Sequence, residues 1–204
     1  MEIFVFGDSI TQGFFDDEQG GWCSRLAAWG MQKGKEVEVF NLGVSGDNTV
    51  DLLARFEIEL LAREPEQGAV VVFAVGINDA QSAIDGGKNR VPLESFERNL
   101  GALYESARSH VSRVCFVGLT PVDEGKVCPT PWKTSHGYTL ENVKQYDSAV
   151  RGFCMKRGAS FIPMLDIFDG GSLNEFLADG LHPNAVGHKR MFERVRDAVE
   201  KQTI

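Results

Sequence analysis

Short apolar runs that alternate with longer amphipathic stretches constrain the fold of this chain more than any other feature. One run, Val70–Val75, is apolar on both faces, as a central strand covered by helices must be. The alternation is typical of a parallel sheet with crossover helices, so we predict an α/β protein. The expected strands are Ile3–Phe6, Val37–Asn41, Val70–Val75, Val114–Leu119 and Ser160–Pro163, and the expected helices are Trp22–Lys33, Thr49–Arg63, Leu93–His110, Thr139–Arg157 and Asn184 to about Lys201.

The length and composition of the chain indicate a single domain. With 204 residues, 43% of them hydrophobic, the chain can form one well-buried core and is short for two. The sequence contains no internal repeat, low-complexity tract or linker that would divide it. We therefore predict one domain over residues 1–204.

Charge and apolar content disfavour some classes of partner. The chain has 21 basic and 29 acidic residues, and its formal net charge of −8 would repel a nucleic-acid backbone. The first expected strand begins directly after Met1 without a basic, apolar leader, and no segment approaches the roughly 18 apolar residues of a membrane span. We expect a soluble, cytoplasmic protein with no nucleic-acid partner and no stable membrane insertion. Homo-oligomerisation stays open.

The cysteines give no sign of a metal site or a disulfide framework. They show no C-x-x-C spacing, and one of them lies in an apolar run where a small hydrophobic side chain fits. We predict four reduced thiols, at Cys23, Cys115, Cys128 and Cys154.

Glycine-rich turns follow the first three expected strands. They span Gly7–Thr11, Asn41–Thr49 and Gly76–Asp79. Open α/β sheets place their sites outside the carboxyl ends of the strands. The polar residues of these turns are therefore expected to converge on one edge of the sheet.

A short motif near the end of the chain, Asp179-Gly-Leu-His182-Pro183, supplies the partners that a catalytic serine needs. A serine hydroxyl is a poor nucleophile near neutral pH, so it needs an imidazole to take its proton and a carboxylate to hold that imidazole in the right tautomer. We predict that Ser9 is the nucleophile, His182 the base and Asp179 the orienting acid. Taken singly, Ser9 could be a helix cap and His182 a surface histidine.

Together, these turns and the Asp-x-x-His motif resemble the conserved blocks of the SGNH (GDSL) hydrolases, which contribute a Ser, a Gly, an Asn and a His. The matching residues are Ser9, Gly46, Asn78 and His182, and the resemblance runs from residue 3 to about residue 190. The first block reads Gly-Asp-Ser-Ile where Leu is usual, and the third reads Gly-Ile-Asn-Asp where a second Gly is frequent. Neither departure touches a chemical group. The resemblance implies a three-layer α/β/α sandwich with a mainly parallel, five-stranded, flavodoxin-like sheet.

Acyl transfer also needs donors for the oxyanion of the tetrahedral intermediate. The backbone N–H groups of Ser9 and Gly46 can approach closely, the second because glycine has no Cβ. The side chain of Asn78 can add an NH₂ donor, although an asparagine taken alone is more often a turn residue. The family resemblance favours the oxyanion role for Asn78. No metal and no cofactor is expected.

Substrate-binding residues cannot be assigned from the sequence, and the candidates are Trp132, Tyr138 and Phe14. The first two lie in the irregular segment 120–138, which is expected to be a wall or lid of the site or a plain surface excursion. We interpret Asp8, Asp47 and Asp79 as turn or cap residues, His110, His136 and His188 as solvated, and Phe15 and Trp22 as either site wall or core.

The sequence thus predicts a serine esterase that cleaves small, short-acyl carboxylic esters through an acyl-enzyme. A carbohydrate O-acetylesterase, a thioesterase or lysophospholipase and an acyltransferase would use the same triad and stay open. One rival is a metallophosphoesterase with ligands drawn from the polar turns, but it lacks the several histidines of a dinuclear site. The other is a non-enzymatic flavodoxin-like binder with a phosphate at Ser9–Gly13, which leaves Asp179 and His182 without a role.

Overall fold

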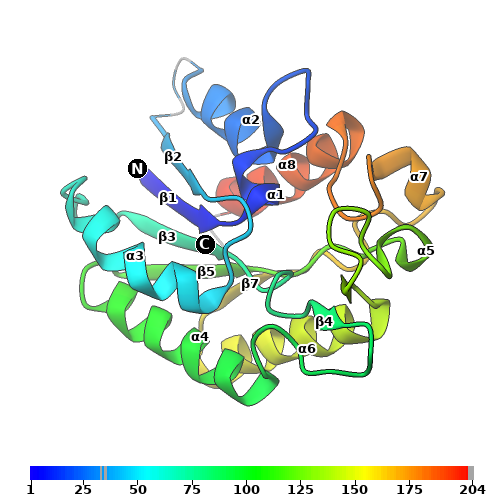
Figure 1. Cartoon of the computed structure of the whole chain (residues 1–204). Coiled ribbons are helices and arrows are strands. Elements are labelled where there is room, and N and C mark those ends of the chain that lie inside the picture. Colours follow the sequence, from blue (N-terminus) through cyan, green and yellow to red (C-terminus); the bar gives the residue numbers. More distant parts are fainter. Residues whose placement is uncertain (33, 35, 202–204) are drawn as a thin grey trace.

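The computed structural model describes residues 1–32, 34 and 36–201. At its centre is a five-stranded sheet, parallel throughout, with the strand order β2-β1-β3-β5-β7 (Figure 1). This is the flavodoxin-like order, so the fold that the family resemblance implied is confirmed. The strands are β1 (Glu2–Gly7), β2 (Glu38–Gly43), β3 (Val70–Ala74), β5 (Arg113–Val117) and β7 (Ser160–Ile162).

Helices cover both faces of the sheet and complete an α/β/α sandwich (Figure 1). On one face, α2 (Gly21–Gly30) packs against α8 (Ala185–Glu200). On the other face, α3 (Thr49–Leu61) contacts α4 (Leu93–Arg108), which in turn contacts α6 (Leu140–Arg157). The helix expected over Thr49–Arg63 corresponds to α3, which ends two residues earlier than expected. The helix expected over Trp22–Lys33 corresponds to α2, and its expected end at Lys33 lies outside the described residues.

Short helices and strands lie at the edge of the sheet where the central strands end. They are α1 (Ser9–Gln12), β4 (Ser82–Ala83), α5 (Glu124–Val127), β6 (His136–Gly137) and α7 (Leu173–Phe176). The segment 120–138, expected to be irregular, thus contains α5 and β6, and β6 pairs antiparallel with β4. Helix α1 was not expected from the sequence, because a four-residue helix is too short to show an apolar period.

The core consists of the sheet and the apolar faces of its helices. Val70–Phe73 of β3 are fully buried, as a central strand covered on both faces requires. The rings of Phe6, Phe73 and Phe116, from three neighbouring strands, follow one another with centroids 6.2 and 5.2 Å apart. Burying an aromatic or aliphatic side chain of this size stabilises the fold by about 1.5–3 kcal/mol.

The register of the strands brings their carboxyl ends level. Gly7, the last residue of β1, lies opposite Gly43 of β2 and Ala74 of β3. Only glycine fits at Gly7, since a Cβ there would lie 2.2 Å from Thr11 Oγ1 and 2.5 Å from the Ala74 carbonyl oxygen. The turns after these strands consequently start side by side.

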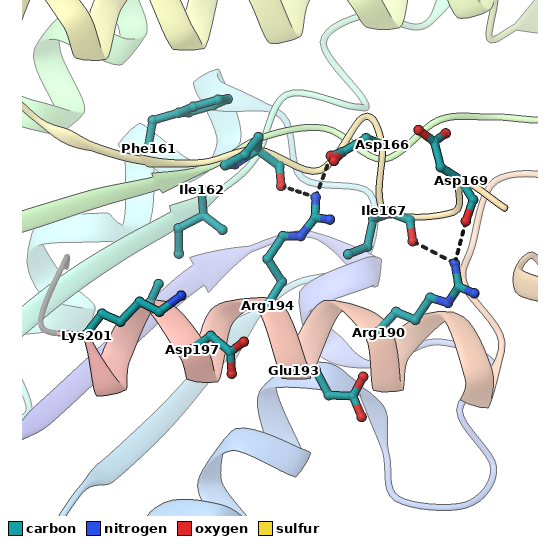
Figure 2. Close-up of a pocket in the computed structure, with 12 residues that line it drawn as sticks. Phe161, Ile162, Asp166, Ile167, Asp169, Arg190, Glu193, Arg194, Asp197 and Lys201 are labelled. Atoms are coloured by element: carbon teal, nitrogen blue, oxygen red, sulfur yellow. Dashed lines mark hydrogen bonds and ion pairs between the residues drawn. The ribbon is translucent and has the colours of Figure 1, made fainter.

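An open groove of about 770 Å³ lies elsewhere, between α8 and the chain after β7 (Figure 2). Arg194 donates to the carbonyl of Pro163, and Arg190 donates to the carbonyls of Ile167 and Asp169. None of the predicted site residues lines this groove. Among the described residues, no helix combines the length and apolar character needed to cross a membrane.

Candidate active site

Ser9 is the first residue of the one-turn helix α1, directly after β1. Asp8 precedes it as the N-cap, and its Oδ1 accepts a hydrogen bond of 2.9 Å from the Ile10 N–H. The N-cap is thus Asp8 and not Ser9, which leaves the Ser9 hydroxyl available for other contacts. Since the first N–H groups of a helix have no intrahelical carbonyl partner, the Ser9 N–H is a potential donor to a ligand.

The Asp179–His182 loop lies between α7 and α8 and is held by its own carboxylate. Asp179 Oδ1 accepts from the backbone N–H groups of Leu181 (2.9 Å) and His182 (2.8 Å). Gly180, between them, has a φ of +94°, a conformation that favours glycine. The Asp179 side chain therefore shapes the turn that presents the imidazole of His182.

Ser9, His182 and Asp179 form one continuous chain of hydrogen bonds. His182 Nδ1 lies 2.8 Å from Asp179 Oδ2, and His182 Nε2 lies 2.9 Å from Ser9 Oγ. An ionised carboxylate can only accept, so Nδ1 carries the proton and Nε2 is free to accept from the Ser9 hydroxyl. Burial acts to raise the pKa of Asp179, but the hydrogen bonds from His182 and Leu181 outweigh it and hold this pKa below its usual value. The carboxylate thus stays ionised.

The two other turns meet each other at the edge where β1, β2 and β3 end. The side-chain Nδ2 of Asn78 donates to the carbonyl oxygen of Asp47 (2.9 Å), which ties the third turn to the second. Gly46 has a φ of +87°, and a Cβ there would meet no atom within 4 Å. Because an amide NH₂ has two N–H groups, one remains on Asn78 after the bond to Asp47.

Buried carboxylates anchor these turns to the helices. Asp79 accepts from the Thr49 N–H (3.1 Å) and hydroxyl (2.5 Å) at the start of α3. Asp47 accepts from Arg55 Nε (2.7 Å), whose guanidinium also donates to the carbonyls of Gly7 and Leu42. Asp8 caps α1 and Asp79 bonds the start of α3, as expected of turn or cap residues, whereas the ion pair of Asp47 with Arg55 was not expected from the sequence.

Two of these carboxylates have unusual titration behaviour. Burial raises the pKa of Asp8 to about 7, although the hydrogen bond from the Ile10 N–H and the electrostatic interaction with His182 act against it. Burial likewise raises the pKa of Asp79 to about 6, despite the hydrogen bonds from Thr49. Near neutral pH a substantial share of the Asp8 carboxyl groups is consequently uncharged.

Three aromatic rings surround the imidazole of His182. Their centroids lie 5.4 Å (Phe14), 5.5 Å (Phe15) and 6.1 Å (Trp132) from that of the histidine ring. The three side chains are 44%, 49% and 53% exposed, so they form an accessible rim and are not core. We call Phe14, Phe15 and Trp132 the aromatic rim. By contrast, Trp22 is fully buried and Tyr138 is 2% exposed, so neither offers its ring as an open wall.

His188 was expected to be solvated, and this expectation is wrong. Its side chain is fully buried; Nδ1 accepts from the Trp22 N–H (3.2 Å) and Nε2 donates to the Phe14 carbonyl (3.0 Å). Burial lowers the pKa of His188, which favours the neutral form that this pairing needs. No local sequence signal marks the role, because both partners lie more than 160 residues away.

The strand order, with helices on both faces of the sheet, defines this protein as a three-layer α/β/α sandwich. Residues 5–190 match the model of the GDSL-like lipase/acylhydrolase family. The chain belongs to this family and is an enzyme that hydrolyses ester bonds.

Relatives with esterase names match almost the whole chain. It is 30% identical over 217 residues to the isoamyl acetate-hydrolyzing esterase 1 homolog of Bos taurus, a match covering 98% of this chain and 82% of that protein. It is 24% identical over 193 residues to esterase TesA of Pseudomonas aeruginosa, covering 95% and 85%. The crystal structure of the acetyl xylan esterase AlAXEase shares the fold, with a TM-score of 0.76 at 20% identity over 98% of this chain and 100% of that one.

Proposed function

We propose that the protein is a serine esterase that cleaves short-acyl carboxylic esters through a Ser9–His182–Asp179 triad and an acyl-enzyme. The observation that carries this proposal is the continuous hydrogen-bonded chain from Asp179 through His182 to Ser9, at the sheet edge where the Gly46 and Asn78 turns meet. Catalytic mutants of Axe2, an acetylxylan esterase from Geobacillus stearothermophilus, have a serine, an aspartate or a histidine replaced by alanine. The residue types agree with the proposed triad.

In the acylation step, Ser9 Oγ attacks the ester carbonyl while His182 Nε2 takes the hydroxyl proton. A tetrahedral intermediate forms, and its collapse breaks the bond to the alcohol oxygen, which receives the proton from Nε2. A water molecule then attacks the acyl-enzyme with His182 again as base, and Ser9 leaves with the proton. Asp179 keeps the imidazole in the required tautomer through both steps.

The negative oxygen of the tetrahedral intermediate needs preorganised donors. We assign this role to the backbone N–H groups of Ser9 and Gly46 and to the second N–H of the Asn78 amide. The turn of Gly46 and the amide of Asn78 are held together by the bond to the Asp47 carbonyl, so the donors do not have to reorganise during the reaction.

The aromatic rim favours small esters with an apolar alcohol group. Because His182 returns its proton to the leaving alcohol, the rings around its imidazole are placed to contact that group. A short acyl group agrees with the names of the relatives. The isoamyl acetate-hydrolyzing esterase homolog and the acetyl xylan esterases of the same fold are all named for acetyl esters. Carbohydrate acetyl esters, thioesters and transfer to another acceptor use the same chemistry.

Covalent labelling tests the nucleophile directly. A fluorophosphonate probe should label Ser9, as located by mass spectrometry, and Ser9→Ala should abolish both labelling and turnover of p-nitrophenyl acetate. Ser148→Ala, an exposed serine on α6, serves as the matched control and should react like the parent. An adduct on another residue, or full turnover by Ser9→Ala, would refute the proposal.

Chelation separates the esterase from the metallophosphoesterase alternative. Within the part of the chain that the structure describes, no three His, Cys, Asp or Glu side chains are grouped so as to hold a metal ion. We expect ester turnover to be unchanged after prolonged treatment with EDTA. Activity that is lost with EDTA and restored by a divalent cation would favour the metal-dependent reaction.

A further inference from the structure

Tyr138 makes a contact that the catalytic scheme does not require. It lies at the end of the segment 120–138, and its hydroxyl donates to Asn78 Oδ1 at 3.0 Å. The other end of the same amide, Nδ2, donates to the Asp47 carbonyl at 2.9 Å. The Asn78 amide is therefore held at both its oxygen and its nitrogen.

We propose that Tyr138 is a positioning residue that locks the Asn78 amide with its free N–H toward the oxyanion. This inference rests on the proposed role of Asn78 as an oxyanion donor. If the amide rotated by half a turn, Oδ1 would face the Asp47 carbonyl and the substrate oxyanion, and both contacts would be repulsive. The Asp47 carbonyl can only accept and so selects the orientation with Nδ2 toward it, and the bond from the Tyr138 hydroxyl to Oδ1 holds the amide plane in that orientation.

The surroundings of Tyr138 suit this role. Burial, together with the nearby Asp8 carboxyl, raises the pKa of the phenol, so the hydroxyl remains a donor over the working pH range. Its backbone N–H donates to the Val127 carbonyl at 2.9 Å, which anchors the residue to α5. The segment 120–138 thus contributes Trp132 to the aromatic rim and also Tyr138, which holds the proposed oxyanion donor Asn78 in place.

A double-mutant cycle tests the coupling between Tyr138 and Asn78. Tyr138→Phe removes only the hydroxyl and should lower kcat for p-nitrophenyl acetate by roughly 10–100-fold with little change in KM, while Asn78→Ala should lower kcat by about 10²–10³. In the Asn78→Ala background, Tyr138→Phe should cause no further loss. Tyr146→Phe is the matched control, because this fully buried tyrosine also donates its hydroxyl, to the Val91 carbonyl. It should lower the melting temperature without lowering kcat.

The outcomes separate the two ideas. If Asn78→Ala lowers kcat and Tyr138→Phe does not, the positioning role is wrong and the proposed function stands. Equal losses from Tyr138→Phe in the parent and in Asn78→Ala also overturn the positioning role, because a locking contact has no effect once the amide is gone. If Asn78→Ala itself leaves kcat unchanged, the oxyanion role of Asn78 fails, and the inference fails with it.

A different observation points to a buried water site beneath the Ser9 turn. Among the described residues, the buried side-chain atoms without a hydrogen-bond partner are Thr11 Oγ1, Trp22 Nε1 and Thr120 Oγ1. All three residues line one small cavity of about 20 Å³, together with Asp8. One water needs about 10–15 Å³ and usually has two to four polar partners. We infer that a single water occupies this cavity, accepting from the indole and bonded to both hydroxyls.

Water oxygen-17 relaxation dispersion and a crystal structure of the parent protein test this site. We expect one ordered water within hydrogen-bond distance of the three atoms, and one fewer long-lived water in Thr120→Val. If Thr120→Val does not fold, Trp22→Phe takes its place. Empty density in the cavity, or dispersion that is identical in parent and variant, overturns the inference.

Discussion

The two carboxylate oxygens of Asp179 have separate tasks. Oδ1 accepts from the backbone N–H groups of Leu181 and His182 and shapes the turn, whereas Oδ2 accepts from the imidazole. An asparagine can keep the first task, since its carbonyl oxygen accepts as well. It cannot keep the second, because an NH₂ group facing Nδ1 favours the tautomer with the proton on Nε2.

We therefore expect Asp179→Asn to lower kcat by roughly 10²–10⁴ while the melting temperature changes little. Steady-state kinetics with p-nitrophenyl acetate and thermal unfolding measure the two quantities. Asp179→Ala removes both tasks and should lower the melting temperature as well. Near-normal turnover by Asp179→Asn would show that another group orients His182.

At the level of single residues, the proposed triad could be predicted from the sequence, whereas the contacts of His188 and Tyr138 could not. Ser9, Asp179 and His182 lie in short motifs whose chemistry is readable from the residue types and their order. The contacts of His188 with Phe14 and of Tyr138 with Asn78 join segments far apart in the chain, and neither residue lies in a motif. Such roles depend on which side chains the fold brings together, and local patterns do not contain that information.

Among the elements, the loop between α1 and α2 shows the clearest local strain. Phe15, in the aromatic rim, has a φ of +64°, a left-handed conformation that costs a non-glycine residue about 1–2 kcal/mol. The loop is held in place by Asp16, whose carboxylate accepts from the Gly21 N–H and pairs with Arg25. The chain therefore maintains a strained aromatic residue beside His182, which suggests a role for that ring in substrate binding.

Phe15→Gly separates this role from stability. Glycine adopts the positive φ without strain, and the ring is 49% exposed, so we expect a melting temperature no lower than that of the parent. The KM for short alkyl acetates should rise, because the rim loses a ring. Glu64→Gly is the matched control: Glu64 also has a positive φ, of +47°, but is exposed before β3, so KM should not change. A lower melting temperature with an unchanged KM would contradict this account of Phe15.

Trp132 belongs to the same rim but comes from the segment 120–138. If the rim contacts the alcohol group, Trp132→Ala should flatten the dependence of kcat/KM on alcohol length in a series of acetates from methyl to isoamyl. Each buried CH₂ contributes up to about 0.8 kcal/mol, so the effect should grow with chain length. A parallel series of ethyl esters with longer acyl groups should respond less. A larger change in the acyl series would assign Trp132 to the acyl side instead.

The central strands and long helices could be predicted from the sequence, most of their ends to within a few residues. The short elements at the edge of the sheet could not be predicted. Apolar runs such as Val70–Val75 and the glycine that ends α6, Gly158 with a φ of +65°, mark their elements directly. α1 has four residues and depends on the Asp8 cap, and β4 and β6 have two residues each and exist through their pairing. Elements of this length are specified by tertiary contacts, because they contain too few residues for an apolar period.

For the molecule as a whole, carboxylates buried in the turns at the ends of β1 and β3 link stability to pH. Burial raises the pKa of Asp8 from 3.8 to about 7. Between these two values the native state holds a proton that the unfolded chain has released. The free energy of unfolding therefore falls as pH rises through this window, and the contribution of Asp8 is greatest below the lower value. Asp79, with a pKa raised to about 6, acts in the same direction.

Asp8→Asn should remove the share of this pH dependence that belongs to Asp8. Asparagine keeps an oxygen acceptor for the Ile10 N–H and cannot ionise, so the cap survives without a buried charge. Since one pKa unit corresponds to about 1.4 kcal/mol, we expect the unfolding free energy of the variant relative to the parent to increase by roughly 1 kcal/mol or more between pH 5 and pH 8. Urea denaturation at the two pH values measures this difference.

Asp16→Asn provides the control with the opposite sign. Although burial opposes it, the hydrogen bonds from Arg25 and from backbone N–H groups lower the pKa of Asp16 to about 2. Its stabilisation is complete above the unfolded value of 3.8 and is lost only as pH falls toward 2. Asp16→Asn should therefore destabilise the protein equally at pH 5 and pH 8. If the unfolding free energy of Asp8→Asn relative to the parent instead differs by the same amount at pH 5 and pH 8, the Asp8 carboxyl is ionised throughout this range. Its charge is then solvated by a buried water or through a local opening.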